Sequence, residues 1–193
     1  MSSDYLNKSA INKLNFCSVG KNVQISNSVK FYNCELIKIG DNVRIDANTV
    51  ITASKSEIEF GSFIHIGVNC YINGSFGLEL HDFTALSAGT NLFTSSDDYS
   101  GSHMTNPTVP SELTNPLNGK VIINRYANIG SNTVIMPNLS IGEGSVVGAL
   151  SFVNKSIKPW GIYFGSPVRR IGERKKTVIE LSKRLSNEKQ KKI

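Results

Sequence analysis

Residues 128–157, NIGSNTVIMPNLSIGEGSVVGALSFVNKSI, decide the fold, because large apolar side chains recur in them at every sixth position. These side chains are Ile129, Ile135, Ile141, Val147 and Val153. Amphipathic helices repeat about every 3.6 residues and half-buried strands every 2, so neither produces a strict period of six. The period instead indicates a solenoid in which equivalent side chains stack from one coil to the next.

The same period extends upstream as six triplets of large apolar residues, which are Val19, Ile25, Phe31; Ile39, Ile45, Ile51; Phe60, Ile66, Ile72; Leu80, Leu86, Leu92; Ile123, Ile129, Ile135; and Ile141, Val147, Val153. Successive triplets begin 20, 21, 20, 43 and 18 residues apart. Every departure from 18 follows the third member, so insertions are tolerated at one vertex of a three-sided coil. The sequence therefore predicts an all-β parallel β-helix of about six triangular coils.

Residues that reach positive φ cheaply stand three positions after the apolar ones, where a tight coil must bend. They are Asn22, Asn42, Asn48, Asn69, Gly89, Asn132, Asn138 and Gly144. We expect the helix to occupy residues 19–157, after an N-terminal segment of residues 1–18. Residues 97–120 are proline-bearing and aperiodic, which predicts a projecting loop. Residues 158–193 form an extension ending in an α-helix with Val178, Leu181 and Leu185 on one face.

Composition and charge narrow the function classes. Hydrophobic residues make up 39% of the chain, and the N-terminus resembles neither a signal peptide nor a membrane span, which predicts a cytoplasmic protein. Cys17, Cys34 and Cys70 lack paired metal spacing and are expected to be buried thiols. The net charge of +6 resides in the tail, where ten Lys and Arg face three Glu from Val168 onward. Without interleaved aromatics the tail does not predict nucleic-acid binding, which leaves a solvated helix or a phosphate-rich ligand.

Three segments in order resemble the hexapeptide-repeat acyltransferases, particularly the sugar acetyltransferases. They are IHIGVNCYIN (64–73), residues 128–157 quoted above, and GIYFGSPVRRI (161–171). The resemblance covers residues 19–174 and implies a left-handed β-helix that assembles as a homotrimer, with active sites between neighbouring subunits. It also implies that acetyl-CoA is the co-substrate and a sugar the acceptor.

The resemblance also implies a set of coenzyme-binding residues. Ser131 and Ala149 match positions whose main chain bonds the pantetheine arm, and Asn154 and Lys155 match a Thr-Lys pair beside it. Cations that would contact the coenzyme phosphates follow, with Arg169 the best match and Arg170, Arg174 and Lys175 nearby.

The catalytic group is where the match to the family fails, because Asp97 stands where galactoside-type enzymes carry a histidine. Attack on a thioester calls for a general base and for donors to the oxyanion. His65, facing outward, and His103, on the loop, are the candidates, whereas His81 is expected at a corner. We hypothesise that His65 of one subunit meets Asp97 or Asp98 of its neighbour.

The acceptor is expected to contact Asn73 and Tyr99. A nucleotide-linked amino sugar that is N-acetylated for surface polysaccharide synthesis is the first interpretation, and O-acetylation of a saccharide hydroxyl is the alternative. An amine with a modest pKa could attack without any protein base. The three histidines lack the spacing of a zinc site, so no metal is expected. A non-catalytic scaffold remains the alternative of another class.

Overall fold

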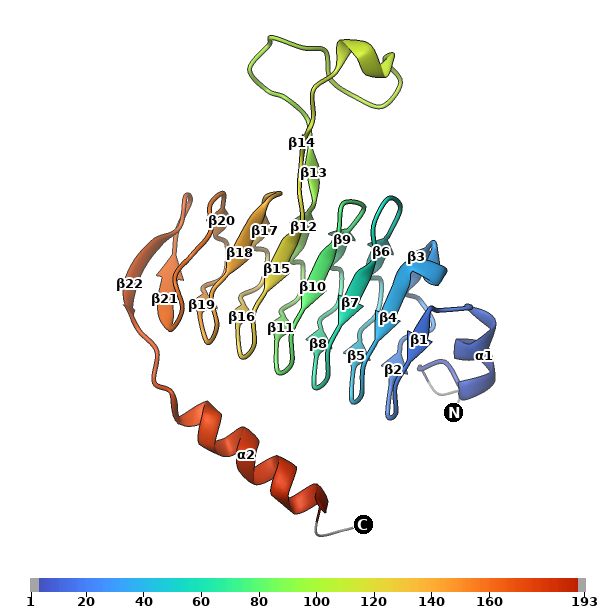
Figure 1. Cartoon of the computed structure of the whole chain (residues 1–193), viewed down its shortest axis with the longest axis vertical. Coiled ribbons are helices and arrows are strands. Elements are labelled where there is room, and N and C mark those ends of the chain that lie inside the picture. Colours follow the sequence, from blue (N-terminus) through green and yellow to red (C-terminus); the bar gives the residue numbers. More distant parts are fainter. Residues whose placement is uncertain (1–3, 191–193) are drawn as a thin grey trace.

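The computed structural model describes residues 4–190, with side chains described as far as residue 185. The chain forms a three-sided parallel β-solenoid, whose coils succeed one another across Figure 1 from the N-terminal end to the C-terminal end. Six coils are complete, and β21 begins a seventh, so the predicted parallel β-helix is confirmed and is slightly longer than expected. The ends of both predicted terminal segments, residues 1–3 and 191–193, lie outside the described residues.

Each side of the prism is one sheet, and each complete coil contributes one strand to each sheet. Face 1 contains β1 (Ser18–Val19), β4 (Ile37–Ile39), β7 (Ile58–Phe60), β10 (Leu78–Leu80), β15 (Val121–Ile123) and β18 (Leu139–Ile141). Face 2 contains β2 (Gln24–Ile25), β5 (Arg44–Ile45), β8 (His65–Ile66), β11 (Ala85–Leu86), β16 (Asn128–Ile129), β19 (Val146–Val147), β21 (Gly161–Phe164) and the antiparallel β22 (Arg169–Glu173). Face 3 contains β3 (Lys30–Tyr32), β6 (Val50–Thr52), β9 (Tyr71–Asn73), β12 (Asn91–Phe93), β17 (Val134–Ile135) and β20 (Phe152–Val153).

The predicted apolar triplets form the core in the expected register. Ile45 pairs with Ile66, for example, and Ile66 with Leu86 in the next coil. Sixteen of the eighteen predicted core residues are buried, each contributing on the order of 1.5–3 kcal/mol of burial free energy. The exceptions, Val19 and Phe31, lie in the first coil, which has a neighbouring coil on one side only. The short α1 (Lys8–Lys13) partly covers that end through buried Ile11.

The corners confirm the predicted bends, because all eight named Asn and Gly residues have positive φ. The corner between faces 1 and 2 also holds large side chains in this conformation, at Phe63, Phe83, Tyr126 and Trp160. Non-glycine residues seldom adopt it unless their surroundings compensate. Here the rings stack along the axis with centroids 4.7 Å, 5.4 Å and 6.3 Å apart, a feature we call the aromatic column.

The coil insertions collect at the corner between faces 3 and 1. The first carries a 3-10 turn (Cys34–Leu36), whereas the largest leaves the prism on a two-stranded stem, β13 (Ser95–Ser96) and β14 (Leu117–Asn118). The segment beyond the stem stands clear of the solenoid in Figure 1 and includes a second 3-10 turn (Ser111–Leu113). The stem and the segment beyond it expose large apolar side chains, at Tyr99, Met104, Leu113 and Leu117.

The C-terminal α2 (Thr177–Gln190) follows β22 and contacts the aromatic column. Tyr126 Oη and Ser182 Oγ are 2.7 Å apart, and Lys176 lies over the Trp160 ring. The predicted apolar face lines a groove against the column, yet it is incompletely covered, since Leu181 remains 55% exposed. No helix among residues 4–190 is both long enough and apolar enough to cross a bilayer.

The expectation of three buried thiols is wrong for Cys17, which is exposed, whereas Cys34 is half-buried and Cys70 is buried. Cys17 immediately precedes β1 in the first coil, where no earlier coil covers it.

Candidate active site

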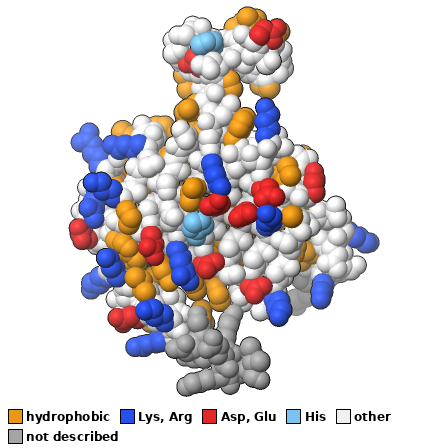
Figure 2. Space-filling model, viewed as in Figure 1, with side chains coloured by type: hydrophobic (Ala, Val, Ile, Leu, Met, Phe, Trp, Pro, Cys, Tyr) orange, Lys and Arg blue, Asp and Glu red, His pale blue; other side chains and the backbone are white. Residues whose placement is uncertain are grey.

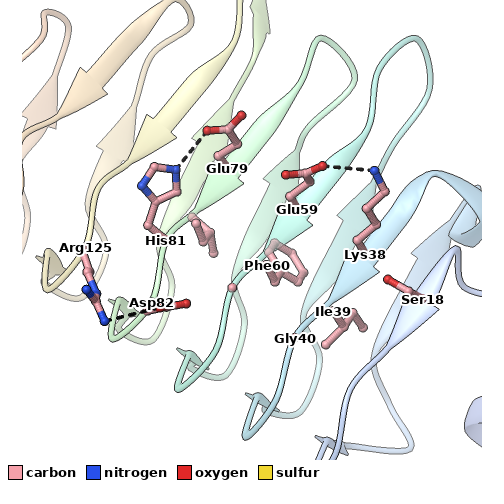
Figure 3. A pocket seen from close by; sticks show the side chains of 12 residues that line it. Ser18, Lys38, Ile39, Gly40, Glu59, Phe60, Glu79, His81, Asp82 and Arg125 are labelled. Atoms are coloured by element: carbon pink, nitrogen blue, oxygen red, sulfur yellow. Dashed lines mark hydrogen bonds and ion pairs between the residues drawn. The ribbon is translucent and has the colours of Figure 1, made fainter. Parts of the chain in front are cut away.

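A hollow of about 480 Å³ lies on face 1, where Figure 3 shows its charged side chains paired with one another. Lys38 Nζ is 3.1 Å from a Glu59 oxygen, and His81 Nε2 is 3.0 Å from a Glu79 oxygen. His81 follows β10 directly, at the corner position expected for it. The opposite charges of this hollow are thus already paired with one another within the chain, as is common on solvated protein surfaces.

A second groove, also of about 480 Å³, lies on face 3 at the foot of the projecting segment. It brings together three predicted site residues, Asn73, Asp97 and Tyr99, with an apolar wall of Phe93, Val134, Met136 and Phe152. Among the side chains that the structure describes, residues 4–185, none forms an ion pair or a hydrogen bond with the Asp97 carboxylate. An unpaired carboxylate beside an apolar wall is an arrangement that can hold an amine.

The predicted coenzyme residues flank this groove. Ser131 and Ala149 lie at the corner between faces 2 and 3 in coils 5 and 6, where Leu150 N donates to Ser131 O at 2.8 Å. Asn154 and Lys155 follow β20, on the opposite side of the same stretch of face 3. That these two pairs contact the pantetheine arm stays a prediction.

The predicted phosphate-binding cations lie beyond the groove at the C-terminal end, where basic side chains gather along the left edge of Figure 2. Arg169 and Arg170 are on β22, and Arg170 Nη2 is 3.2 Å from Glu173. Arg174 Nη1 instead donates to the carbonyls of Tyr126 (2.6 Å) and Gly144 (3.1 Å), and burial lowers the pKa of this guanidinium. Arg174 thus tethers the C-terminal segment to the aromatic column.

His65 lies on face 2, half-exposed as expected, but its carboxylate partner belongs to its own chain. Nε2 of His65 is 2.7 Å from Oδ2 of Asp46, whose Oδ1 accepts hydrogen bonds from Arg44 Nε (2.6 Å) and Tyr5 Oη (3.3 Å). Burial raises the pKa of Asp46, but the hydrogen bonds from His65 and Arg44 outweigh it, and the net pKa is lowered. Asp46 is a residue of this pair that the sequence motifs did not single out, although the period places it one coil before His65.

The second predicted carboxylate, Asp98, is also engaged within the chain. His103 Nδ1 is 2.8 Å from Asp98 Oδ2, and Ser100 N donates to Oδ1 at 2.8 Å. Hydrogen bonds from Ser100 and His103 lower the pKa of Asp98 to about 2. One chain therefore contains two separate His–Asp pairs, and Asp97 is the carboxylate that remains for a substrate or a neighbouring subunit. Among the described side chains of residues 4–185, no three His, Cys, Asp or Glu residues group as a metal site.

No protein-family model matches this chain. It is 37% identical over 177 residues, 92% of each chain, to the dTDP-4-amino-4,6-dideoxy-D-glucose acyltransferase of Escherichia coli. It is 36% identical over 119 residues to the galactoside O-acetyltransferase of Escherichia coli K12, covering 59% of this chain and 56% of that one. The full-length match therefore favours the acyltransferase that acts on an amino sugar.

Solved structures agree with this ranking. AntD, an N-acyltransferase from Bacillus cereus solved with dTDP and 3-hydroxybutyryl-CoA, superposes with a TM-score of 0.94 at 37% identity over 97% of this chain and 99% of that chain. A hexapeptide-repeat acetyltransferase from Vibrio cholerae shares the fold at a TM-score of 0.58 and 21% identity, covering 91% of this chain and 83% of that chain. The coils and the groove thus define a left-handed β-helix acyltransferase.

The chain belongs to the hexapeptide-repeat acyltransferases, within the group of N-acyltransferases for dTDP-linked amino sugars. The predictions of family, enzyme class and N-acyl transfer to a nucleotide-linked amino sugar are confirmed. The coenzyme is confirmed as an acyl-CoA.

Proposed function

We propose that this chain transfers an acyl group from acyl-CoA to the 4-amino group of a dTDP-linked 4-amino-4,6-dideoxyhexose. The 37% identity along 92% of both chains to an enzyme named for that acceptor carries the proposal. A variant of AntD with one serine replaced by cysteine was also solved with dTDP-4-amino-4,6-dideoxyglucose and coenzyme A. We place the reaction in the cytoplasm, on the route to a surface polysaccharide, with acetyl as the transferred group.

A spacing found in AntD supports the groove on face 3 as part of the active site. Variants of AntD were solved with a serine or an aspartate replaced, and these two positions are ten residues apart. Of the six aspartates in this chain, Asp97 alone has a serine ten residues before it, Ser87. Ser87 follows β11 on face 2, so the two candidates lie on different faces of the prism.

The surface chemistry of the three faces supports a homotrimer. Face 1 carries Lys38, Glu59 and Glu79 in its strands, and Figure 2, which shows the same side as Figure 1, has acids and bases intermixed there. Large apolar side chains are instead exposed around the corner between faces 2 and 3, at Val68, Leu150 and Phe164. Because protein interfaces are depleted in charge at their centre, we infer that these corners meet around a threefold axis. Face 2 of each copy then meets face 3 of the next.

The proposed reaction uses both sides of that cleft. Asp97, beside face 3 of one copy, accepts a hydrogen bond from the acceptor amine. This bond orients the lone pair of the amine nitrogen toward the thioester carbon. Ser87, on face 2 of the neighbour, donates to the carbonyl oxygen as it becomes an oxyanion. His65, on that same face and held by Asp46 through Nε2, takes the amine proton at Nδ1. The C–N bond forms first and gives a tetrahedral oxyanion. When the carbonyl re-forms the C–S bond breaks, and the departing sulfur receives the proton from His65 and leaves as coenzyme A thiol.

Thiol release with defined acceptors tests the proposed function. The protein is incubated with acetyl-CoA or 3-hydroxybutyryl-CoA and either dTDP-4-amino-4,6-dideoxyglucose or a simple galactoside, and the product is identified by mass spectrometry. We expect an amide of the amino sugar and no galactoside ester. Acylation of the galactoside hydroxyl without acylation of the amine would replace the proposal by the O-acyltransferase alternative.

A further inference from the structure

Two cationic side chains that have no role in the proposed reaction lie at one end of the proposed cleft. Through β21, and within residues 4–190, the strands of face 2 contain one Lys, Arg, Asp or Glu, which is Arg44, and those of face 3 contain one, Lys30. Both are cations, both are exposed, and both lie in the first two coils. The cations expected to meet the coenzyme, at Arg169 and beyond, lie at the opposite end of the solenoid.

Arg44 is held as a phosphate-binding arginine would need to be. Its Nε donates to Asp46 at 2.6 Å, and its guanidinium carbon lies 5.6 Å from the centre of the Tyr5 ring. As far as side chains are described, to residue 185, its two terminal nitrogens have no hydrogen-bond partner, and the side chain is 53% exposed. A guanidinium fixed by one nitrogen presents its other two as a preorganised fork, which suits the oxygens of a phosphate.

The axial distance fits an acceptor that carries a diphosphate. Arg44 is in coil 2, and Ser87 and Asp97 belong to coil 4. Two coils are separated by about 10 Å, since neighbouring strands are about 4.8 Å apart. That separation is roughly the length of a hexose ring with its anomeric phosphate, so an amine at coil 4 places the diphosphate near coil 2.

We infer that Arg44 binds the diphosphate of the nucleotide-linked acceptor, with Asp46 and Tyr5 as positioning residues and Lys30 of the adjacent copy across the cleft. This inference rests on the proposed function and adds the positions of the two substrates along the cleft. The acceptor enters along the N-terminal coils, the coenzyme lies along the C-terminal coils, and the reacting groups meet at coil 4. Two anionic ligands thereby occupy opposite ends of one cleft without mutual repulsion.

Steady-state kinetics and calorimetry with dTDP test the assignment on Arg44→Ala and Arg44→Lys. Lys38→Ala is the matched control, because Lys38 holds the equivalent outward position of the same coil on face 1. We expect Arg44→Ala to raise the acceptor KM and the dTDP Kd at least tenfold while the acyl-CoA KM changes less than twofold. Arg44→Lys keeps the positive charge but loses the forked pair of donors, so its acceptor KM and dTDP Kd should lie between those of the wild type and Arg44→Ala. Lys38→Ala should have wild-type values of both.

Direct dTDP binding separates this inference from the proposed function. Unchanged dTDP affinity in Arg44→Ala, an equal rise in both KM values, or a wild-type protein that does not bind dTDP would overturn the diphosphate assignment. A wild-type protein that binds dTDP, loses that affinity in Arg44→Ala and yet acylates no amino sugar would support the assignment and overturn the proposed function. Circular dichroism and sedimentation of each variant confirm that the trimer has formed.

Discussion

At the scale of single residues, His65 and His81 are alike in exposure and in bonding a carboxylate through Nε2. Each is about half-exposed and bonded to a carboxylate, yet His65 lies on face 2 and His81 on the ion-paired face 1. We expect His65→Ala to lower kcat at least a hundredfold, the lower end of general-base effects, with little change in the acyl-CoA KM. His81→Ala should retain wild-type kcat. A fully active His65→Ala together with an inactive His103→Ala would show that the general base is His103 on the projecting loop.

Asp46 offers a stability test at the same scale. The pKa of Asp46 in the folded protein lies below the unfolded value of about 3.9. The Asp46 carboxylate therefore contributes its full stabilisation at pH values above about 3.9. That stabilisation is lost as the pH falls through the folded pKa. Asp46→Asn should therefore lower the free energy of unfolding by about 1–2 kcal/mol at pH 7. The difference should shrink near pH 3, as measured by urea unfolding at one fixed protein concentration. A deficit that is equal at both pH values would show that the charge of Asp46 is not its cause.

At the scale of elements, the sequence predicted the core positions and corners that repeat from coil to coil. It did not predict the corners at which residues adopt a backbone conformation that they disfavour. The six-residue period identified the buried core residues, and the Asn and Gly residues at the corners have the positive φ values that these residue types adopt readily. The aromatic column was unpredictable, because Phe83 or Tyr126 at positive φ is disfavoured locally and is compensated only by stacking between coils. The Asp46–His65 pair, by contrast, joins consecutive coils 19 positions apart, so the period alone would have brought the two residues together.

The aromatic column gives α2 its contact with the solenoid, and that contact can be weakened at one atom. Tyr126→Phe removes the hydroxyl 2.7 Å from Ser182 Oγ while keeping the stacked ring. We expect faster amide hydrogen exchange over residues 177–185 and unchanged exchange in coils 3–5. Tyr163→Phe is the control, since its hydroxyl bonds the Lys158 backbone away from α2. Unchanged exchange in α2 would show that the helix is held by its apolar contacts alone.

At the scale of the whole molecule, the proposed site cannot be completed by one chain. His65 and Ser87 are on face 2, whereas Asp97 and Asn73 line the groove on face 3, and the two faces point away from each other. Sequence patterns identified members of both halves, but the proximity of the two halves depends on how neighbouring copies are arranged. The hypothesis of His65 opposite a neighbour's Asp97 therefore stays a prediction, now with Asp46 as the carboxylate that holds His65.

Mixed trimers test this arrangement directly. In a cyclic trimer every cleft joins face 2 of one copy to face 3 of the next. A cleft is intact when its face 2 comes from an Asp97→Asn subunit and its face 3 from a His65→Ala subunit. Random assembly of equal amounts makes about one quarter of clefts intact, from two independent choices of one half. Co-expressed variants should thus recover about 25% of wild-type kcat, although each variant alone is nearly inactive. Were His65 and Asp97 to act within one chain, every cleft would keep a lesion and mixing would restore nothing.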